Sequence, residues 1–393
     1  MVTRKTPKLL IVLVVVALLA SLVIGAGGCK KKVAEVIKIG VLPALTGFIA
    51  ADGQGLLGAI QLWANEVNAS GGLLGKQVEL VVLDSASDPK TANEKAKTLV
   101  GEGVAVVIGP ILSAERSAVY PVVTEAGIPL LYSTFYEGGA YADLMFITGE
   151  VPEQQTQVFV PWLVETYGDR FYFVGSDYEY PRGTNEKAKT YLATAGGKVV
   201  GEEYVVLGTT DFSSVIARIQ AAQPDVVFNN VVGTDAIAFS KQFHSYGLLG
   251  QMTFASTVHM ETYVDAIGVE ASEGIVVCFG YFENLDTPAN NQFVEAYREV
   301  EPNIPLTTIT EAGYAALQMW TQAVKAAGTT EGQAVRQAME GISVDAPEGR
   351  ITLRAIDHHS SRHSYVAEVQ NGQFVVIKDL GVLEPGENQR EGQ

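Results

Sequence analysis

Cysteine and histidine are scarce in this chain, which holds two cysteines and five histidines among 393 residues. Three of the histidines lie between residues 358 and 363. A helical metal site needs a pair at i, i+4 on one helix face, but a strand pattern follows these histidines at once, so no such helix is expected. We therefore expect no metal and no cofactor.

Basic residues are also few, with 27 Lys and Arg against 44 Asp and Glu, and the formal net charge is −17. The body of the chain has no Lys/Arg cluster, which argues against nucleic acid, because phosphate binding needs a clustered basic surface. The acidity is typical of a soluble protein.

Catalytic motifs are missing as well. No G-x-S-x-G elbow occurs, and no Ser/His/Asp set converges, so we expect no enzyme. The run from Gly53 to Gly58 fits G-x-G-x-x-G, but about eight residues separate it from the first expected strand, whereas a dinucleotide fingerprint follows its strand directly.

A long apolar run occurs once, at the start of the chain. Arg4, Lys5 and Lys8 precede the apolar residues 9–24, and small residues then lead to Cys29. This layout predicts a secretory signal, and the cysteine after small residues resembles a bacterial lipoprotein signal in which Cys29 is acylated. An uncleaved anchor and cleavage without lipid remain alternatives. A lipid or an anchor would tether the protein outside the cytoplasmic membrane.

The other cysteine, Cys278, lies in the apolar run 274–282 and is expected to be a buried small hydrophobe. If Cys29 carries a lipid, Cys278 has no partner, and no disulfide can form in the mature chain.

Continuous apolar strands alternate with helical segments along residues 37–132. Examples are the strands at 37–42 and 104–108 and the helix at 113–126. This pattern predicts a parallel sheet covered on both faces, which is a doubly wound α/β lobe. The pattern restarts at 171–255, so we expect a second lobe of the same kind.

Helices at 291–300, 311–328 and 332–340 and short strands after residue 349 follow the second lobe. They fit best as material returned to each lobe, so the chain would cross between lobes three times, near Gly149, 281–284 and 345–349. A ligand cleft would lie between the lobes, at the carboxyl ends of the strands. The expected boundaries are signal 1–28, tether 29–36, lobe 1 at 36–149 plus 284–344, lobe 2 at 150–283 plus 345–384, and tail 385–393.

Several motifs resemble a known family. The segments 38–47, 71–76, 84–89 and 106–110 are similar to the leucine/isoleucine/valine-type periplasmic binding proteins. Others look like the urea and short-chain-amide branch of that superfamily; the most specific is Gly-Ser-Asp-Tyr-Glu-Tyr-Pro-Arg at 175–182, beside Tyr-Glu-Gly at 136–138, Thr-Asp-Phe-Ser at 210–213 and Asp-Ala-Pro-Glu-Gly at 345–349.

The resemblance implies the type I periplasmic-binding-protein fold, with two Rossmann-like lobes and a three-stranded hinge. It also implies delivery of a small polar ligand to an ABC permease and its ATPase, without catalysis.

Candidate ligand-binding residues follow strands of the first lobe. Ser113 lies at a strand-to-helix turn, where its hydroxyl and nearby free N–H groups would face a ligand oxygen. Thr134 would supply a second donor set. Tyr132 and Tyr136 would form walls with a polar tip, and Glu137 would accept ligand N–H groups. Each of these is also a plausible structural residue.

The second lobe contributes a matching set. Tyr178 and Tyr180 would add walls, and Asp177 would add an acceptor. The turn Gly233-Thr234-Asp235 starts a helix. Asp235 would either pair with a ligand ammonium, as the resemblance to leucine-type relatives implies, or favour the helix start.

The function we expect is an extracytoplasmic binding protein of an ABC importer for urea or a short-chain amide. One alternative is a branched-chain amino acid receptor of an importer, which would place a carboxylate at the ligand ammonium. The other is a ligand sensor that acts through a separate signalling partner.

Overall fold

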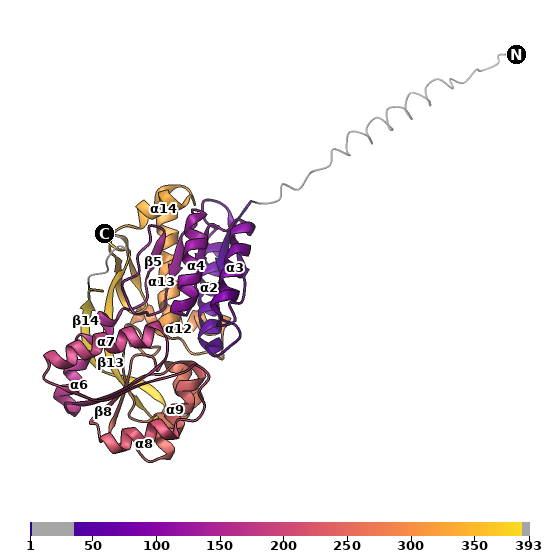
Figure 1. The fold of residues 1–393 in the computed structure, drawn as a ribbon. Coiled ribbons are helices and arrows are strands. Elements are labelled where there is room, and N and C mark those ends of the chain that lie inside the picture. Colours follow the sequence, from indigo (N-terminus) through magenta and orange to yellow (C-terminus); the bar gives the residue numbers. More distant parts are fainter. Residues whose placement is uncertain (2–34, 387–393) are drawn as a thin grey trace. The chain divides into compact units, whose positions relative to one another are not determined.

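The structure is a computed structural model that describes residue 1 and residues 35–386 (Figure 1). The expected signal peptide, Cys29, most of the tether and most of the tail therefore lie outside the described residues. The chain from Val36 onward forms one compact unit, which is described by itself.

The first lobe is built on five parallel strands that pair in the order β2-β1-β3-β4-β5. All side chains of the central strand β3 are buried, as expected for a sheet covered on both faces. Its strands are β1 (Val36–Val41), β2 (Gln77–Val82), β3 (Val106–Ile108), β4 (Leu130–Tyr132) and β5 (Met145–Ile147), and its first helices are α2 (Ala50–Ala69), α3 (Pro89–Glu102) and α4 (Ser113–Glu125).

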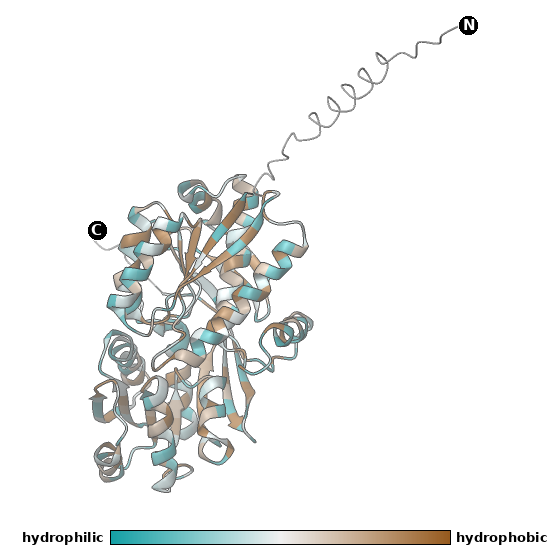
Figure 2. Ribbon diagram, turned by 90° about the vertical axis from the view of Figure 1, so that its right-hand side faces the viewer, coloured by the Kyte–Doolittle hydropathy of each residue, from teal (hydrophilic) through white to brown (hydrophobic). Residues whose placement is uncertain are grey.

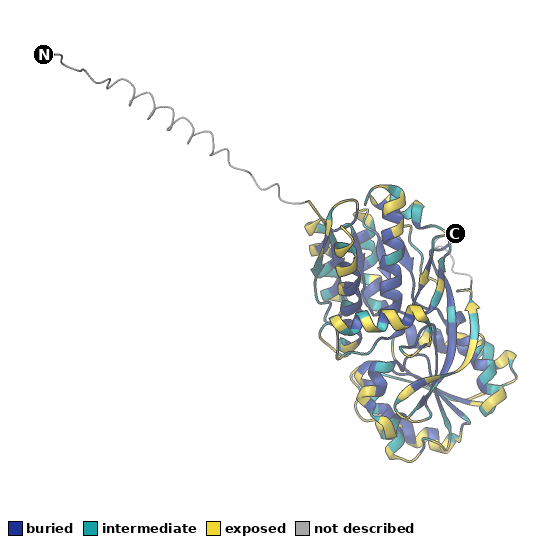
Figure 3. Ribbon diagram, turned by 180° about the vertical axis from the view of Figure 1, so that it is seen from behind, coloured by how far each residue is buried: buried dark blue, intermediate teal, exposed yellow. Residues whose placement is uncertain are grey.

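Three late helices complete this lobe: α12 (Pro288–Val300), α13 (Thr308–Ala327) and α14 (Gly332–Met339). Helix α13 lies along α2 and is buried over most of its length (Figures 1 and 3). Trp63 of α2 donates its indole N–H to Thr321 Oγ1 at 3.0 Å, and its ring meets the edge of Trp320. The chain thus returns to the first lobe after building the second.

The second lobe carries a sheet in the order β7-β6-β8-β9-β10, all parallel, which β13 extends antiparallel to β10. Figure 2 shows its apolar strands between helices whose outer faces are polar. Its strands are β6 (Arg170–Ser176), β7 (Lys198–Val205), β8 (Val226–Asn230), β9 (Thr253–Ser256), β10 (Val276–Phe279), β13 (Ser360–Gln370) and β14 (Gln373–Leu383). Its helices are α5 (Pro152–Thr156), α6 (Phe159–Tyr167), α7 (Glu179–Thr194), α8 (Ser213–Ala222), α9 (Gly233–Ser245), α10 (Glu261–Ile267) and α11 (Val269–Ser272).

The chain passes between the lobes after β5, after β10 and along β13. The third passage differs from the prediction, which placed it at 345–349 and gave the following residues to lobe 2. The hairpin of β11 (Ser343–Ala346) and β12 (Gly349–Leu353) instead packs beside α13. The N–H of Ile147 in β5 donates to the carbonyl of His358 at 2.8 Å, so the chain reaches the second lobe only within β13. The hairpin stays with the first lobe because β11 packs against α13 and buries the side chains of Val344 and Ala346.

Candidate functional site

A small cavity lies where the two lobes meet, with about 30 Å³ open to the centres of water molecules. That space holds one or two waters, so the lobes are nearly closed around it. First-lobe residues on its wall are Ile49, Asp52, Ile111, Leu112, Ser113, Thr134, Phe135 and Ile309, and second-lobe residues are Tyr178, Tyr180, Val232, Met260 and Tyr263.

Four long helices begin at this cavity. Their N-cap residues are Ile49 for α2, Leu112 for α4, Tyr178 for α7 and Val232 for α9, and all four line the cavity. None of these caps gives a side-chain hydrogen bond to its helix. At α9 these groups are already used, because the N–H of Gly233 donates to the Tyr263 hydroxyl at 2.7 Å and that of Thr234 to the carbonyl of Phe48 at 3.3 Å. At the other three helix starts, the first N–H groups and the positive ends of the helix dipoles are available to an oxygen atom of a ligand.

Ser113 lines the cavity as predicted, but its hydroxyl proton is already engaged. Ser113 Oγ donates to Glu137 Oε2 at 2.6 Å, and Arg116 Nη2 pairs with Glu137 Oε1 at 2.7 Å. In this geometry the donating serine offers a ligand only its lone pairs, so the predicted donor role would require this hydroxyl to leave Glu137. Glu137 supports Ser113 and is absent from the cavity wall.

Tyr132 and Tyr136 pack against Arg116 and do not line the cavity. The guanidinium lies over both rings, 5.2 Å and 4.4 Å from their centroids. The Tyr132 hydroxyl donates to the carbonyl of Ile111 at 2.7 Å, and the Tyr136 hydroxyl bonds to His359. These rings were predicted as cavity walls; they instead form the packing that holds Arg116 behind Ser113.

Thr134 and Tyr178 both line the cavity. Thr134 is 4% exposed, and within residues 35–386 its hydroxyl has no hydrogen-bond partner. Burial raises the pKa of the Tyr178 phenol well above its usual value, so its hydroxyl stays neutral. Tyr180 also lines the cavity, but its hydroxyl donates to the carbonyl of Thr257 at 3.1 Å.

The remaining second-lobe candidates lie outside the cavity wall. Asp177 pairs with exposed Arg182 at 2.7 Å. Asp235 Oδ2 accepts from the N–H groups of Gly208 and Thr209, at 2.7 and 3.2 Å, so it does not face a ligand ammonium there.

Gly233 and Thr234 act at the junction of the lobes. The N–H of Thr234 donates to the first-lobe carbonyl of Phe48 at 3.3 Å. Gly233 has a φ of 62°, and a Cβ there would lie 2.6 Å from that same oxygen, so a glycine is needed for this close approach.

Sequence reasoning missed Asp52, the acidic residue on the cavity wall. It lies in the first turn of α2, which begins six residues before the apolar helical pattern becomes visible at Leu56. The signal that could have found it is an acid just before that pattern, since acidic residues favour a first helical turn.

A valine at position 134 tests the unpaired hydroxyl. Thr134→Val keeps the shape but removes a buried group that has no partner in the described chain. We expect the unliganded protein to be as stable as the wild type or more stable, and ligand affinity to fall by up to about tenfold. Calorimetric titration and unfolding of the free protein measure the two effects. Loss of stability with affinity unchanged would show that the hydroxyl is structural.

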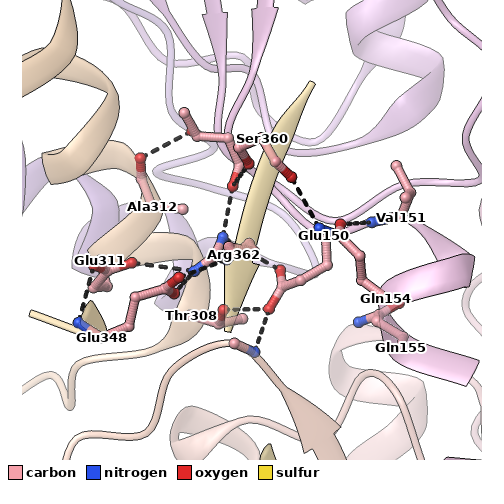
Figure 4. Close-up of polar contacts among 12 residues, drawn as sticks. Glu150, Val151, Gln154, Gln155, Thr308, Glu311, Ala312, Glu348, Ser360 and Arg362 are labelled. Atoms are coloured by element: carbon pink, nitrogen blue, oxygen red, sulfur yellow. Dashed lines mark hydrogen bonds and ion pairs between the residues drawn. The ribbon is translucent and has the colours of Figure 1, made fainter. Parts of the chain in front are cut away.

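The passages between the lobes share a buried ionic network (Figure 4). Arg362 of β13 is fully buried and contacts Glu348 and Glu311, the latter with Nη2 to Oε2 at 3.2 Å. It also donates to the carbonyl of Thr148, beside the first passage, at 2.6 Å. Glu150 lies in that passage, and its Oε2 is 3.8 Å from Arg362 Nη1.

The second passage joins the same network. Glu150 Oε1 accepts from the N–H of Gly280 at 2.7 Å and from Thr308 Oγ1 at 2.6 Å. A Cβ at Gly280 would lie 2.6 Å from Arg362 Nε, so this position also needs a glycine. One guanidinium thus ties together all three passages.

Three carboxylates surround this one guanidinium, so the network favours an added proton. Burial raises the pKa of Glu311 to about 7, against the lowering effect of Arg362, and raises that of Glu348 well above its usual value. In the unfolded chain these carboxyl groups lose their protons at about pH 4–5. The contribution of Glu311 to the free energy of unfolding should therefore decline as the pH rises from about 4–5 to about 7.

Glu311→Gln tests this pH dependence. Between about pH 5 and pH 8 the wild type should lose on the order of 2–3 kcal/mol more stability than the variant. Urea unfolding at both values measures the difference, and equal pH slopes would contradict the assignment.

The comparisons with known proteins agree with this architecture. The sequence profile of the family described as "Periplasmic binding protein" matches residues 36–373. The chain belongs to the periplasmic binding protein family. This membership implies a place outside the cytoplasm, and the described residues include no helix long and apolar enough to cross a membrane. They also include no group of three or more His, Cys, Asp or Glu placed to hold a metal ion.

Similar periplasmic binding proteins include a Leu/Ile/Val-binding protein of Rhizobium johnstonii, 26% identical over 87% of this chain and 94% of its own length. A leucine-, isoleucine-, valine-, threonine- and alanine-binding protein of Pseudomonas aeruginosa is 24% identical over 85% of this chain and 90% of its own.

Solved structures show the same fold. A solute-binding protein of an ABC transporter from R. palustris, in complex with benzoate, has a TM-score of 0.83 and 22% identity and covers 90% of this chain and 99% of its own. A leucine-binding protein of Thermotoga maritima has a TM-score of 0.78 and 21% identity and covers 88% and 99%. The predicted two-lobed type I fold is confirmed.

Proposed function

We propose that this periplasmic binding protein captures urea or a short-chain amide between its lobes and delivers it, chemically unchanged, to an ABC permease driven by an ATPase. We also propose that an acyl chain on Cys29 tethers it to the membrane. The resemblance of the segment 175–182 to the amide branch supports the ligand class.

The observation that carries the ligand class is the small size of the cavity, together with the few polar groups on its mostly apolar wall. About 30 Å³ open to water centres suits a ligand of a few heavy atoms better than a benzoate or a leucine. The helix starts offer N–H donors to a carbonyl oxygen, and Ser113 Oγ and Asp52 offer acceptors to an amide NH₂.

The cavity wall also lacks Lys, Arg and His, so no cationic side chain on it would neutralise a ligand carboxylate. A neutral amide needs no such partner. Its polar atoms would all be hydrogen-bonded after closure, and each bond is worth about 0.5–1.5 kcal/mol net.

The second candidate is a branched-chain amino acid, because the Rhizobium and Pseudomonas relatives carry such names. Asp235 faces the loop at Gly208, so an ammonium would have to use Asp52. The lobes would also have to stay further apart to admit an aliphatic side chain.

Thermal unfolding and calorimetric titration with urea, acetamide, leucine and benzoate test the proposal. We expect urea or acetamide to raise the unfolding midpoint and to be recovered intact. Stabilisation by leucine or benzoate alone would show that the ligand class is wrong.

A further inference from the structure

Asp52 is a buried carboxylate on the wall of the cavity. It lies in the first turn of α2, and its residue is 2% exposed. Its Oδ1 accepts from Thr262 Oγ1 of α10, on the opposite lobe, at 2.7 Å. Closure therefore seals this carboxylate from solvent and fixes its orientation.

This carboxylate has no cationic partner. Within residues 35–386 no Lys, Arg or His nitrogen lies within 4 Å of it, and the cavity wall carries none of these residues. Burial raises its pKa to about 6, so it is still mostly ionised at neutral pH. An ionised carboxylate only accepts hydrogen bonds, and Thr262 occupies one of its oxygens.

The start of α4 supplies the complementary donors from the same lobe. Ser113 brings the N–H of the first residue of this 13-residue helix to the cavity, whereas the N–H of Leu112 donates to Glu115 Oε2 at 3.1 Å. The Thr134 hydroxyl is buried there without a partner in the described chain. The cavity thus has a donor pole and an anionic acceptor pole.

We propose that Asp52 is the residue that determines specificity: it accepts the NH₂ edge of the ligand and excludes the carboxylate of the same shape. The inference rests on the proposed amide function and names how the site tells an amide from an acid. Acetamide and acetate have nearly the same shape, but acetamide has an NH₂ group where acetate has a negatively charged oxygen. Acetamide satisfies both poles, whereas acetate places a second anion against Asp52 with no counter-ion.

The test is the ratio of the acetate to the acetamide dissociation constant, measured by calorimetry at about pH 8, where Asp52 is ionised. We expect the wild type to prefer acetamide by about a hundredfold or more. Asp52→Asn removes the charge and keeps the size, and should lower this ratio at least about tenfold. Asp265→Asn is the control, since it removes an exposed carboxylate from α10 near Thr262 and should leave the ratio unchanged.

Asp52→Ser is a second variant in case the asparagine form folds poorly, because serine also removes the charge and is smaller. Circular dichroism and the unfolding midpoint verify folding. If the ratio of the acetate to the acetamide dissociation constant in Asp52→Asn or Asp52→Ser stayed within about threefold of the wild-type ratio, the role of Asp52 would be overturned. Acetamide binding in the same experiment would still uphold the proposed function. Absence of both acetamide and urea binding in the wild type would overturn the function and this inference together.

Discussion

Arg362→Met should lower the free energy of unfolding by about 3–5 kcal/mol. Methionine leaves Glu150, Glu311 and Glu348 buried without the guanidinium that now faces all three. Removing one partner of a buried ionic network is costly because the remaining charges stay desolvated. The same change frees the carbonyl of Thr148 from its donor at the first passage.

The matched control is Arg350→Met. Arg350 pairs with Asp345 at 3.3 Å, but both side chains are largely exposed, at 67% and 85%. Exposed pairs contribute about 0–1 kcal/mol. Urea unfolding of both variants gives the comparison, and similar losses would show that the network contributes no more than a surface ion pair.

Gly183→Ala should weaken ligand binding by about tenfold or more while leaving the free protein as stable or more stable. Gly183 lies within α7, on the second lobe, and a Cβ there would come 2.7 Å from Glu137 Cβ on the first lobe. The clash exists only when the lobes are closed. In the open form alanine simply improves helix propensity, by about 0.5–1 kcal/mol.

Gly101→Ala in α3 provides the control, because nothing lies within 4 Å of a Cβ at that position. It should gain the same helix propensity without any loss of affinity. Calorimetry with the best ligand and thermal unfolding of the free protein separate the effects. If Gly183→Ala bound its ligand as tightly as the wild type, closure across this contact would be wrong.

The sequence predicted the fold where strand and helix patterns are long. The strand predicted at 104–108 is a continuous apolar run, and the one predicted at 225–229 contains the apolar run 226–228; the structure buries every residue of β3 and β8. It missed β5, α5 and α6. α5 is too short to show a period, and β5, unlike the equally short β3 and β4, has no helix between it and the strand before it. It misplaced the third passage because the turn at 345–349 looks like a linker, although its flanking residues pack into the first lobe.

The site was predicted only in part. Ser113, Thr134, Tyr178 and Tyr180 follow strands and do line the cavity. Tyr132 and Tyr136 follow the same rule, yet their rings pack against Arg116, a buried arginine three residues after the first residue of α4, and only tertiary packing reveals this contact.

The glycines of the apparent nucleotide pattern have a structural explanation. Gly53 and Gly58 lie inside α2, where a Cβ would meet the backbone of Ala44 or the ring of Tyr297. They allow close packing of α2, and no phosphate loop forms there.

Small-angle X-ray scattering with and without acetamide or urea tests the central claim, that two hinged lobes close over a small ligand. We expect a smaller radius of gyration when ligand is added to the wild type, and a reduced response at the same ligand concentration for Gly183→Ala. Scattering curves that superimpose with and without a ligand shown by calorimetry to bind would contradict it.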